Sequence, residues 1–246
     1  MASQRKGGQG QIEERSKREQ RANRILDAAA ELMLRWGYNK TTIDDIARYA
    51  GVAKGTIYLH WKTREDLFTA LMKREYIRLV QDVQQRIAND PEGGTLHGIT
   101  KHSMLATMKS PLMKAVLLRD TDLLGEWMRK EFASTSFSEQ IAQSLALFEH
   151  LRSRGVVRDD SDIRKQVYML DAITMGFLVI DQYMPDDFKY SDEEIVEMTA
   201  EAVERVFPPS QQPDEKTKQE IANTVISSLD NVLAIRNRID QEEDTP

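Results

Sequence analysis

Polar side chains between Lys54 and His60 have the types and the spacing of a surface that contacts nucleic acid. On a helix from about Ala53 to Trp61, Ile57 and Trp61 are one turn apart and point inward. The outward positions are Lys54, Gly55, Thr56, Tyr58 and His60. Lysine neutralises a phosphate or reaches a guanine edge, threonine bonds to a phosphate or touches a thymine methyl group, and the tips of tyrosine and histidine suit backbone oxygens. Glycine lets the helix approach closely.

A preceding helix and a tight turn are needed to position this segment. Thr42 is suited to cap the first turn of such a helix, with Asp45 three residues later as its capping-box partner. Apolar residues at helical spacing predict one buried face, formed by Ile43, Ile46, Ala47 and Ala50. Gly51 follows where a left-handed residue stops a helix. The order predicts a helix-turn-helix whose second helix fits the major groove, and an ordinary helical hairpin in an all-α core is the alternative.

A third helix is predicted to begin at Thr63, with acidic residues in its first turn. Its free amides, beside Arg64, would hold a further phosphate. The predicted DNA contacts are therefore Thr42, Lys54, Gly55, Thr56, Tyr58, His60 and Arg64. Replacing Tyr58, His60 or Arg64 is expected to weaken DNA binding and to leave the fold intact.

The motifs over about Ile25 to Leu71 occur in a fixed order. They are Gly37, Thr42, Ile46-Ala47, Ala50-Gly51-Val52, Gly55-Thr56-Ile57-Tyr58, His60-Trp61 and Arg64-Glu65-Asp66-Leu67. This order resembles the DNA-binding domain of the TetR family of bacterial transcription regulators. Ala53 stands where that family often has serine, so the second helix of the motif lacks a side-chain cap. The resemblance implies a dimer that binds a palindromic operator and responds to a small molecule.

Composition narrows the classes of protein that fit. The 246 residues are enough for a small head and a larger second domain. The absence of cysteine excludes disulfides and thiolate chemistry. The longest apolar run, residues 173–180, is too short to span a bilayer, and no secretory signal is recognisable, which together favour a soluble cytoplasmic protein.

The net charge of -6 conceals a division along the chain. Residues 1–90 carry a net charge of +5, whereas residues 91–246 carry -11. A basic head on an acidic body directs the head toward nucleic acid. We expect four segments: a disordered basic tail over residues 1–16, a helix-turn-helix domain over 17–71, a ligand-binding and dimerisation domain over 72–207, and an extra helix with a tail over 208–246. Arg5, Lys6 and Arg15 of the tail either form a minor-groove arm or are merely solvated.

Helices are predicted throughout, without a convincing strand, so the fold class is all-α. The first helix should run from Lys17 to Trp36, with Trp36 inward. The helix Thr63–Ala88 should link head and body. The later helices are expected at Thr95–Lys109, Pro111–Leu118, Asp122–Phe132, Ser136–Ser153, Ser161–Met184, Ser191–Val206 and Asp214–Ile239. The last of them, with Ile221, Val225, Leu229, Val232 and Ile235 inward, should dock on its own body or on a partner subunit.

The helix Ser161–Met184 is apolar nearly all round from Val167 to Ile180, which predicts burial on every side. The resemblance implies that it pairs with Ser191–Val206 and their copies in a dimer. Asp171 lies inside the apolar run, either as the counter-charge of a lipophilic cation or, as we favour, as a hydrogen-bonded structural residue.

An effector pocket is expected within the body. Flexible methionines and aromatic side chains suit bulky and varied ligands, although any helical core contains them. The predicted lining residues are His102, Met104, Met108, Leu123, Trp127, Phe148, Tyr168, Asp171 and Met175.

Motifs of enzymes, metals and cofactors are not found in the sequence. We therefore expect neither catalysis, nor a metal, nor a cofactor. The function predicted is a ligand-responsive repressor that binds duplex DNA as a homodimer. The alternative is an architectural or interaction protein that binds DNA constitutively and has no effector.

Overall fold

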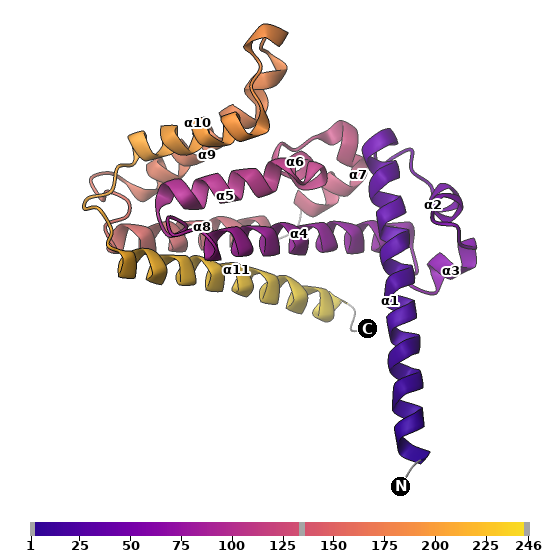
Figure 1. Cartoon of the computed structure of the whole chain (residues 1–246). Coiled ribbons are helices and arrows are strands. Elements are labelled where there is room, and N and C mark those ends of the chain that lie inside the picture. The colour runs from indigo at the N-terminus through magenta and orange to yellow at the C-terminus, as the bar shows by residue number, and fades with distance from the viewer. Residues whose placement is uncertain (1–2, 133–135, 244–246) are drawn as a thin grey trace. The chain divides into compact units, whose positions relative to one another are not determined.

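The computed structural model describes residues 3–132 and 136–243 of the chain. These ranges contain helices and no strand, which confirms the all-α fold (Figure 1). The helices are α1 (Ser3–Trp36), α2 (Ile43–Ala50), α3 (Lys54–Tyr58), α4 (Arg64–Ala88), α5 (Leu96–Met108), α6 (Pro111–Leu117), α7 (Thr121–Phe132), α8 (Ser136–Ser153), α9 (Ile163–Val179), α10 (Asp192–Val206) and α11 (Glu215–Glu243), with short 3-10 turns η1 (Ile180–Gln182) and η2 (Asp186–Phe188). None of the described helices is long and apolar enough to cross a membrane.

The chain forms two compact units. Unit 1 comprises Met1–Glu75 and Ala115–Glu131, and unit 2 comprises Tyr76–Lys114 and Phe132–Pro246. The fully buried side chains of unit 1 include Ile25, Leu32, Met33, Ile46, Ile57, Leu67 and Phe68. The edge of the Tyr38 ring packs on Phe68, with the ring centroids 4.8 Å apart. The burial of Ile46 and Ile57 confirms the inward faces predicted for the two short helices.

Helix α1 ends at Trp36 as predicted but differs from the expectation in its start and in the exposure of Trp36. It begins at Ser3, so the tail predicted to be disordered is helical within the described residues. Glutamine, glutamate, lysine and arginine dominate this stretch, and their high helix propensity lets the helix continue beyond its packed part. Trp36, expected inward, is 47% exposed. The side chains of Arg5, Lys6 and Arg15 lie outside the described part of the chain, so the minor-groove arm stays a prediction.

Helix α7 packs in unit 1, whereas the sequence analysis placed this segment in the body. The amide of Tyr38 donates a hydrogen bond to the carbonyl of Leu123 at 2.7 Å. The amide of Glu126 donates to Oδ1 of Asn39 at 3.5 Å, and Trp127 is buried. An amphipathic pattern predicts a buried face without specifying which core that face joins, and this is why the assignment was wrong.

Helix α11 docks on unit 2, one of the two partners expected for it. Its residues Ile221, Ala222 and Val225 join a core that also contains Ile87 of α4 and Phe207. Lys218 pairs with Glu92 at 2.5 Å, and Nε2 of Gln84 donates to Oδ1 of Asp230 at 2.8 Å. The expected inner residues Val232 and Ile235 have side chains outside the described part.

Gly94 permits the close approach of α11. A Cβ atom built on Gly94 would lie 1.8 Å from the carbonyl oxygen of Lys218 and 2.6 Å from its carbonyl carbon. Both atoms belong to the backbone, so a rotamer change does not remove the clash. Only glycine fits here without displacing α11.

Helix α9 is not buried on every side in the single chain. It ends at Val179, before the expected Met184, and Leu178 is a buried apolar residue of the helix. Tyr168 is 77% exposed. The expected burial assumed a second subunit on one side of the helix, so burial on every side stays a prediction for a dimer.

Candidate nucleic-acid interface

The first helix of the motif is fixed by a cap at each end. At its start, Oγ1 of Thr42 accepts a hydrogen bond from the amide of Asp45 at 3.2 Å and donates one to Oδ2 of Asp45 at 2.5 Å. The bond from the Thr42 side chain lowers the pKa of Asp45 below its ordinary value. At its end, Gly51 has φ 65° and ψ 39°, and its amide bonds to carbonyls of the last turn. These caps set the direction in which the chain enters α3.

Helix α3 presents polar residues to solvent and one apolar residue to the core. Ile57 is fully buried, while Lys54 and Gly55 are exposed and Tyr58 is 46% exposed. Nothing lies within 4 Å of the place where a Cβ on Gly55 would be, so this part of the helix surface is open. Ala53 provides no side-chain cap, as expected. The helix ends at Tyr58, earlier than predicted.

Lys54 already has an acidic partner in the free protein. Its Nζ lies 2.9 Å from Oδ2 of Asp44, and this hydrogen bond raises the pKa of Lys54. Both side chains are about half exposed or more. A contact between Lys54 and DNA therefore requires an exchange of Asp44 for a phosphate or a base edge, which costs little at an exposed site. The sequence offered no signal for this pair because the two residues are on different helices.

His60 follows α3 with its ring tilted on Trp61, and the ring centroids are 5.2 Å apart. Partial burial, followed by the positive charges of Arg18 and Arg21, lowers the pKa of His60. The imidazole is therefore mostly neutral at pH values near 7. The neutral ring can donate a hydrogen bond to a phosphate, but it does not provide a positive charge.

Arg64 is placed differently from the other predicted contacts. Its Nε donates to the carbonyl of Thr41 at 2.9 Å, and a terminal nitrogen donates to the carbonyl of Tyr38. The guanidinium lies 4.0 Å from the ring centroid of Tyr38 and 5.0 Å from that of Phe68. These contacts join the start of α4 to the segment between α1 and α2. The expectation that Arg64→Ala leaves the fold intact is therefore corrected, because the substitution removes these hydrogen bonds. A phosphate contact by Arg64 would compete with them.

The amides at the start of α4 are also partly used within the protein. The amide of Thr63 donates to Oδ2 of Asp66 at 2.9 Å, and the amide of Asp66 donates to Oγ1 of Thr63 at 3.0 Å. This reciprocal cap satisfies two of the donors that the sequence analysis assigned to a phosphate. The exposed surface left for DNA is therefore centred on α3.

The residues predicted for an effector pocket do not form one group. Leu123 and Trp127 belong to unit 1, and the other seven belong to unit 2. Within unit 2, His102, Met104 and Phe148 are buried, Met108 and Met175 are half-buried, and Tyr168 and Asp171 are exposed. Incomplete hydration still raises the pKa of Asp171. Helical periodicity identified apolar faces but not the neighbours that each face meets.

Unit 2 contains two cavities, and α11 lines the second of them. The first, of about 240 Å³, is lined by residues that include Glu92, His97, Glu204, Phe207 and Pro213. The second, of about 300 Å³, is lined by residues that include Asp90, Gly94, Lys218 and Ala222. Neither wall includes a residue predicted for the effector pocket. The sequence marks these loops by their prolines and glycines, but the wall that α11 contributes to the second cavity depends on how that helix docks.

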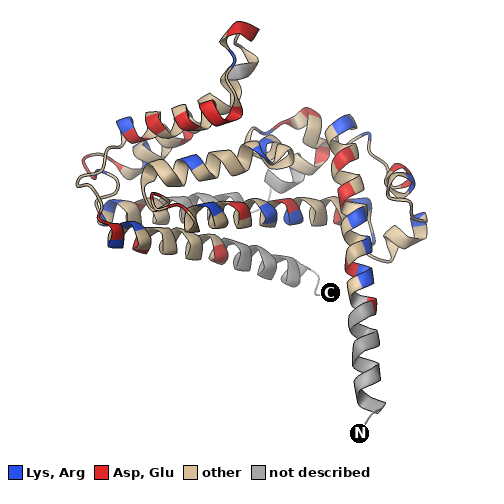
Figure 2. Ribbon diagram, viewed as in Figure 1, with Lys and Arg blue, Asp and Glu red and all other residues tan. Residues whose placement is uncertain are grey.

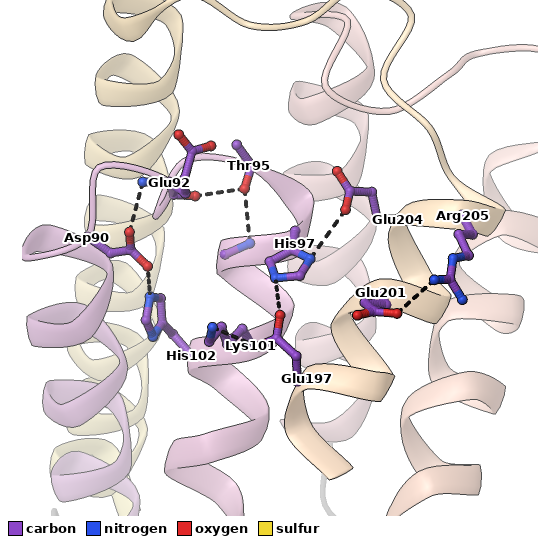
Figure 3. A network of polar contacts seen from close by, with 11 residues as sticks. Asp90, Glu92, Thr95, His97, Lys101, His102, Glu197, Glu201, Glu204 and Arg205 are labelled. Atoms are coloured by element: carbon purple, nitrogen blue, oxygen red, sulfur yellow. Dashed lines mark hydrogen bonds and ion pairs between the residues drawn. The ribbon is translucent and has the colours of Figure 1, made fainter. Parts of the chain in front are cut away.

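A network of polar contacts links α5 to α10 and to the preceding loop (Figure 3). The two ring nitrogens of His97 face Glu197 at 3.2 Å and Glu204 at 3.3 Å. The hydrogen bond from Lys101 lowers the pKa of Glu197. Within the described part of the chain, no group of three or more histidine, aspartate or glutamate side chains is arranged to hold a metal ion.

His102, one of the predicted pocket residues, has a neighbour in that loop. Its Nε2 lies 2.7 Å from Oδ2 of Asp90 (Figure 3). Burial alone would raise the pKa of Asp90, but hydrogen bonds from the Glu92 amide and from His102 bring it below the ordinary value. The arrangement ties α5 to the loop after α4, so His102 already has a structural role.

Comparison with known proteins adds evidence from outside the chain. A model of the bacterial regulatory proteins of the tetR family matches residues 25–71. The HTH-type transcriptional repressor BepR of Brucella suis is 40% identical over 162 residues, which cover 63% of this chain and 77% of that protein. The fatty acid metabolism regulator protein of Bacillus subtilis is 38% identical over 63 residues, covering 26% of this chain and 32% of that protein. The match thus spans about a third of the second relative.

Solved structures show the same fold over most of their length. AibR, crystallised with isovaleryl coenzyme A and operator DNA, superposes with a TM-score of 0.53 and 23% sequence identity. The superposition covers 77% of this chain and 99% of that chain. About a quarter of the present chain therefore has no counterpart in that structure.

Proposed function

The chain belongs to the TetR family of bacterial regulatory proteins, and from this premise we propose that it is a ligand-responsive transcriptional repressor. It binds a palindromic operator as a homodimer in the cytoplasm and is released by a small molecule. Repression requires only that the operator be occupied where it overlaps a promoter. The relative that covers most of the chain is named as a repressor, which supports the same choice.

The observation that carries the proposal is the two-sided character of α3. Ile57 anchors the helix in the core of unit 1, and the opposite side presents Lys54, Gly55 and Tyr58 to solvent. A short helix anchored in this way and held at a fixed angle by Gly51 can enter the major groove. Its outward side chains have the donors that phosphates and base edges accept.

Two classes of variant test this assignment. Lys54→Ala and Thr56→Ala are expected to reduce sequence discrimination, by about 1–3 kcal/mol where the side chain reads a base. Tyr58→Phe and His60→Ala are expected to weaken binding by a similar factor on all DNA sequences, because each variant loses a contact with the phosphate backbone of the DNA. The measurement is a binding curve on a duplex selected by the full-length protein from a random pool, compared with a scrambled duplex.

Lys216→Ala serves as the matched control, because it removes a lysine of α11 in unit 2 whose side chain is 83% exposed. Its binding curves should coincide with those of the unaltered protein. Unchanged binding of all four α3-region variants would contradict the placement of α3 in the groove.

The dimer is supported by exposed apolar side chains on α9 and in the segment after it. Tyr168, Ile180, Tyr183, Phe188 and Tyr190 are all more than 40% exposed in the single chain. Contiguous apolar surface on a protein usually marks an interface, and a second subunit would bury such side chains. A two-fold dimer would present two copies of α3 to two half-sites about one helical turn apart.

Helix α4 is the proposed carrier of the ligand signal. Its residues Leu67 and Leu71 are buried in unit 1, and its residues Val83 and Ile87 are buried in unit 2. A ligand that favours one arrangement of unit 2 would shift the heads away from the operator spacing. Acyl coenzyme A thioesters are the first ligand class to test, since AibR was solved with isovaleryl coenzyme A.

A constitutive DNA-binding protein is the second candidate. It is favoured by one observation, namely that the residues predicted for an effector pocket line neither of the two cavities described in unit 2. In that case unit 2 would serve as a docking surface for other proteins and would have no effector.

Linkage separates the two candidates. If ligand and operator are coupled, saturating operator should weaken the binding of isovaleryl coenzyme A by about 5–150-fold, and the ligand should weaken operator binding by the same factor. Calorimetric titration of the full chain with and without operator measures this. Equal ligand affinity in both titrations, or no ligand binding in either, would favour the constitutive protein.

A further inference from the structure

The part of α1 that precedes Ile25 contributes little to the core of unit 1. Its residues 16–21 are all exposed, as are Asn23 and Arg24. A helical segment that is polar all round has no apolar face to bury, so burial does not explain why it is there. The segment is strongly basic, which points to a surface with an anionic partner.

The cations of this segment differ from most other cations of unit 1. Arg35 pairs with Glu31, Lys54 pairs with Asp44, and Arg74 pairs with Asp27. For Lys17, Arg18, Arg21 and Arg24, the described residues provide neither an ion pair nor a side-chain hydrogen bond. Figure 2 shows blue and red bands on α1 beside the part drawn in grey. Among the described residues, positive charge without a carboxylate partner is therefore concentrated on this segment.

Two of these arginines, Arg18 and Arg21, lie on the same side of α1. Arg18, Arg21 and Ile25 follow each other at spacings of three and four residues, so they lie on one stripe of the helix. Ile25 is fully buried, which means that this stripe faces the core of unit 1. Arg18 and Arg21 continue the same stripe beyond the end of the core. Arg24 lies about 100° away from Ile25 around the helix.

The positive charges of Arg18 and Arg21 act on the side chain of His60. After burial, the charges of Arg18 and Arg21 are the causes that lower its pKa. His60 lies two residues after the end of α3, the helix that carries the outward polar residues. The two arginines are therefore near the end of the candidate DNA surface and extend it along α1.

We propose that Arg18 and Arg21 form a second phosphate-binding site, which clamps the DNA backbone beside the groove that α3 enters. The site takes the phosphodiester oxygens of duplex DNA and reads no base. Guanidinium groups suit this role because they bind phosphate oxygens in a bidentate manner. Glu14 lies one turn before Arg18 and forms no ion pair with it among the described residues. The inference rests on the proposed function, since it requires α3 to dock on DNA.

Salt dependence of DNA binding tests the site. The slope of log affinity against log salt concentration should fall by about 1 for each arginine replaced, and therefore by about 2 in R18A/R21A. The probes are a duplex selected by the full-length protein and a mixed-sequence duplex, and the loss should be the same on both. The matched control is Arg24→Ala, which removes an equal charge from the same helix on another side and should leave the slope nearly unchanged.

Two further measurements separate a phosphate site from a structural effect. The melting temperature of R18A/R21A should equal that of the unaltered protein, because neither side chain has an ion-pair or hydrogen-bond partner among the described residues. The pKa of His60, followed by NMR, should rise in R18A/R21A and stay constant in R24A. A lower melting temperature, an unchanged slope in R18A/R21A, or an equal slope change in R24A would each overturn the inference. Failure of the unaltered protein to bind any duplex would instead overturn the proposed function.

Discussion

Arg64→Ala is expected to lower the free energy of unfolding of unit 1 by about 3 kcal/mol. The substitution removes two hydrogen bonds from a charged donor, each of which contributes about 1.5–3 kcal/mol, and leaves the carbonyls of Tyr38 and Thr41 without these donors. It also removes the guanidinium from the face of the Tyr38 ring. Water that reaches the half-buried site recovers part of the loss, which is why the expected total is below the sum.

The three tryptophans make this effect measurable for unit 1 alone. Trp36, Trp61 and Trp127 all belong to unit 1. Denaturation followed by tryptophan fluorescence therefore reports unit 1, while far-ultraviolet circular dichroism reports the helices of both units. Arg64→Ala should shift the fluorescence transition to lower denaturant concentration.

Arg48→Ala is the matched control for Arg64→Ala. Its side chain is 78% exposed and pairs with Asp45 on the surface, so the expected loss is below about 1 kcal/mol. Arg64→Lys should fall between the two, because lysine keeps the charge but has no planar fork. Coincident fluorescence transitions for Arg64→Ala and Arg48→Ala would refute the structural role. Loss of DNA binding by Arg64→Ala would not by itself establish a DNA contact.

Gly94→Ala is expected to destabilise unit 2 by about 3 kcal/mol, because overpacking a filled site commonly costs about 1–3 kcal/mol and here both clashing atoms belong to the backbone of α11. Relief of the clash requires α11 to move away from α4 and α5. That movement would withdraw Ile221, Ala222 and Val225 from the core of unit 2. The effect should appear as an early loss of circular dichroism that tryptophan fluorescence does not follow.

Gly55→Ala provides the matched glycine control. A Cβ at Gly55 meets nothing within 4 Å, and alanine has the higher helix propensity, so stability should be equal or higher by up to about 1 kcal/mol. Its DNA affinity should fall instead, because the added methyl group occupies the surface that approaches the groove. Identical melting curves for Gly94→Ala and the unaltered protein would show that α11 does not depend on this contact.

The helix-turn-helix could be predicted because its signals are local. The cap at Thr42, the left-handed Gly51 and the inward Ile57 are each determined by residues within a few positions along the chain. The role of Arg64 was not predictable in the same way. Its acceptors lie 26 and 23 residues earlier in the sequence, and a basic residue at a helix start has the same appearance whether it faces a phosphate or a carbonyl.

The effector pocket was beyond the reach of the sequence for a related reason. Trp127 and Phe148 were predicted to line the pocket because they are aromatic, and both are buried. The sequence did not reveal that Trp127 joins unit 1 while Phe148 joins unit 2. Which core a helix joins depends on how the whole chain folds, and the apolar pattern of a single helix does not identify its packing partner.

The membership of α7 in unit 1 has a consequence for the order in which the protein is made. During translation, Tyr38 leaves the ribosome long before Leu123, whose carbonyl accepts the hydrogen bond of the Tyr38 amide. Unit 1 is therefore incomplete on the ribosome until Ala115–Glu131 has emerged, and by then Tyr76–Lys114 has become a loop closed at both ends. A fragment that stops at Leu71 would lack this last piece. The DNA-binding head is for this reason completed only by a segment from the middle of the chain.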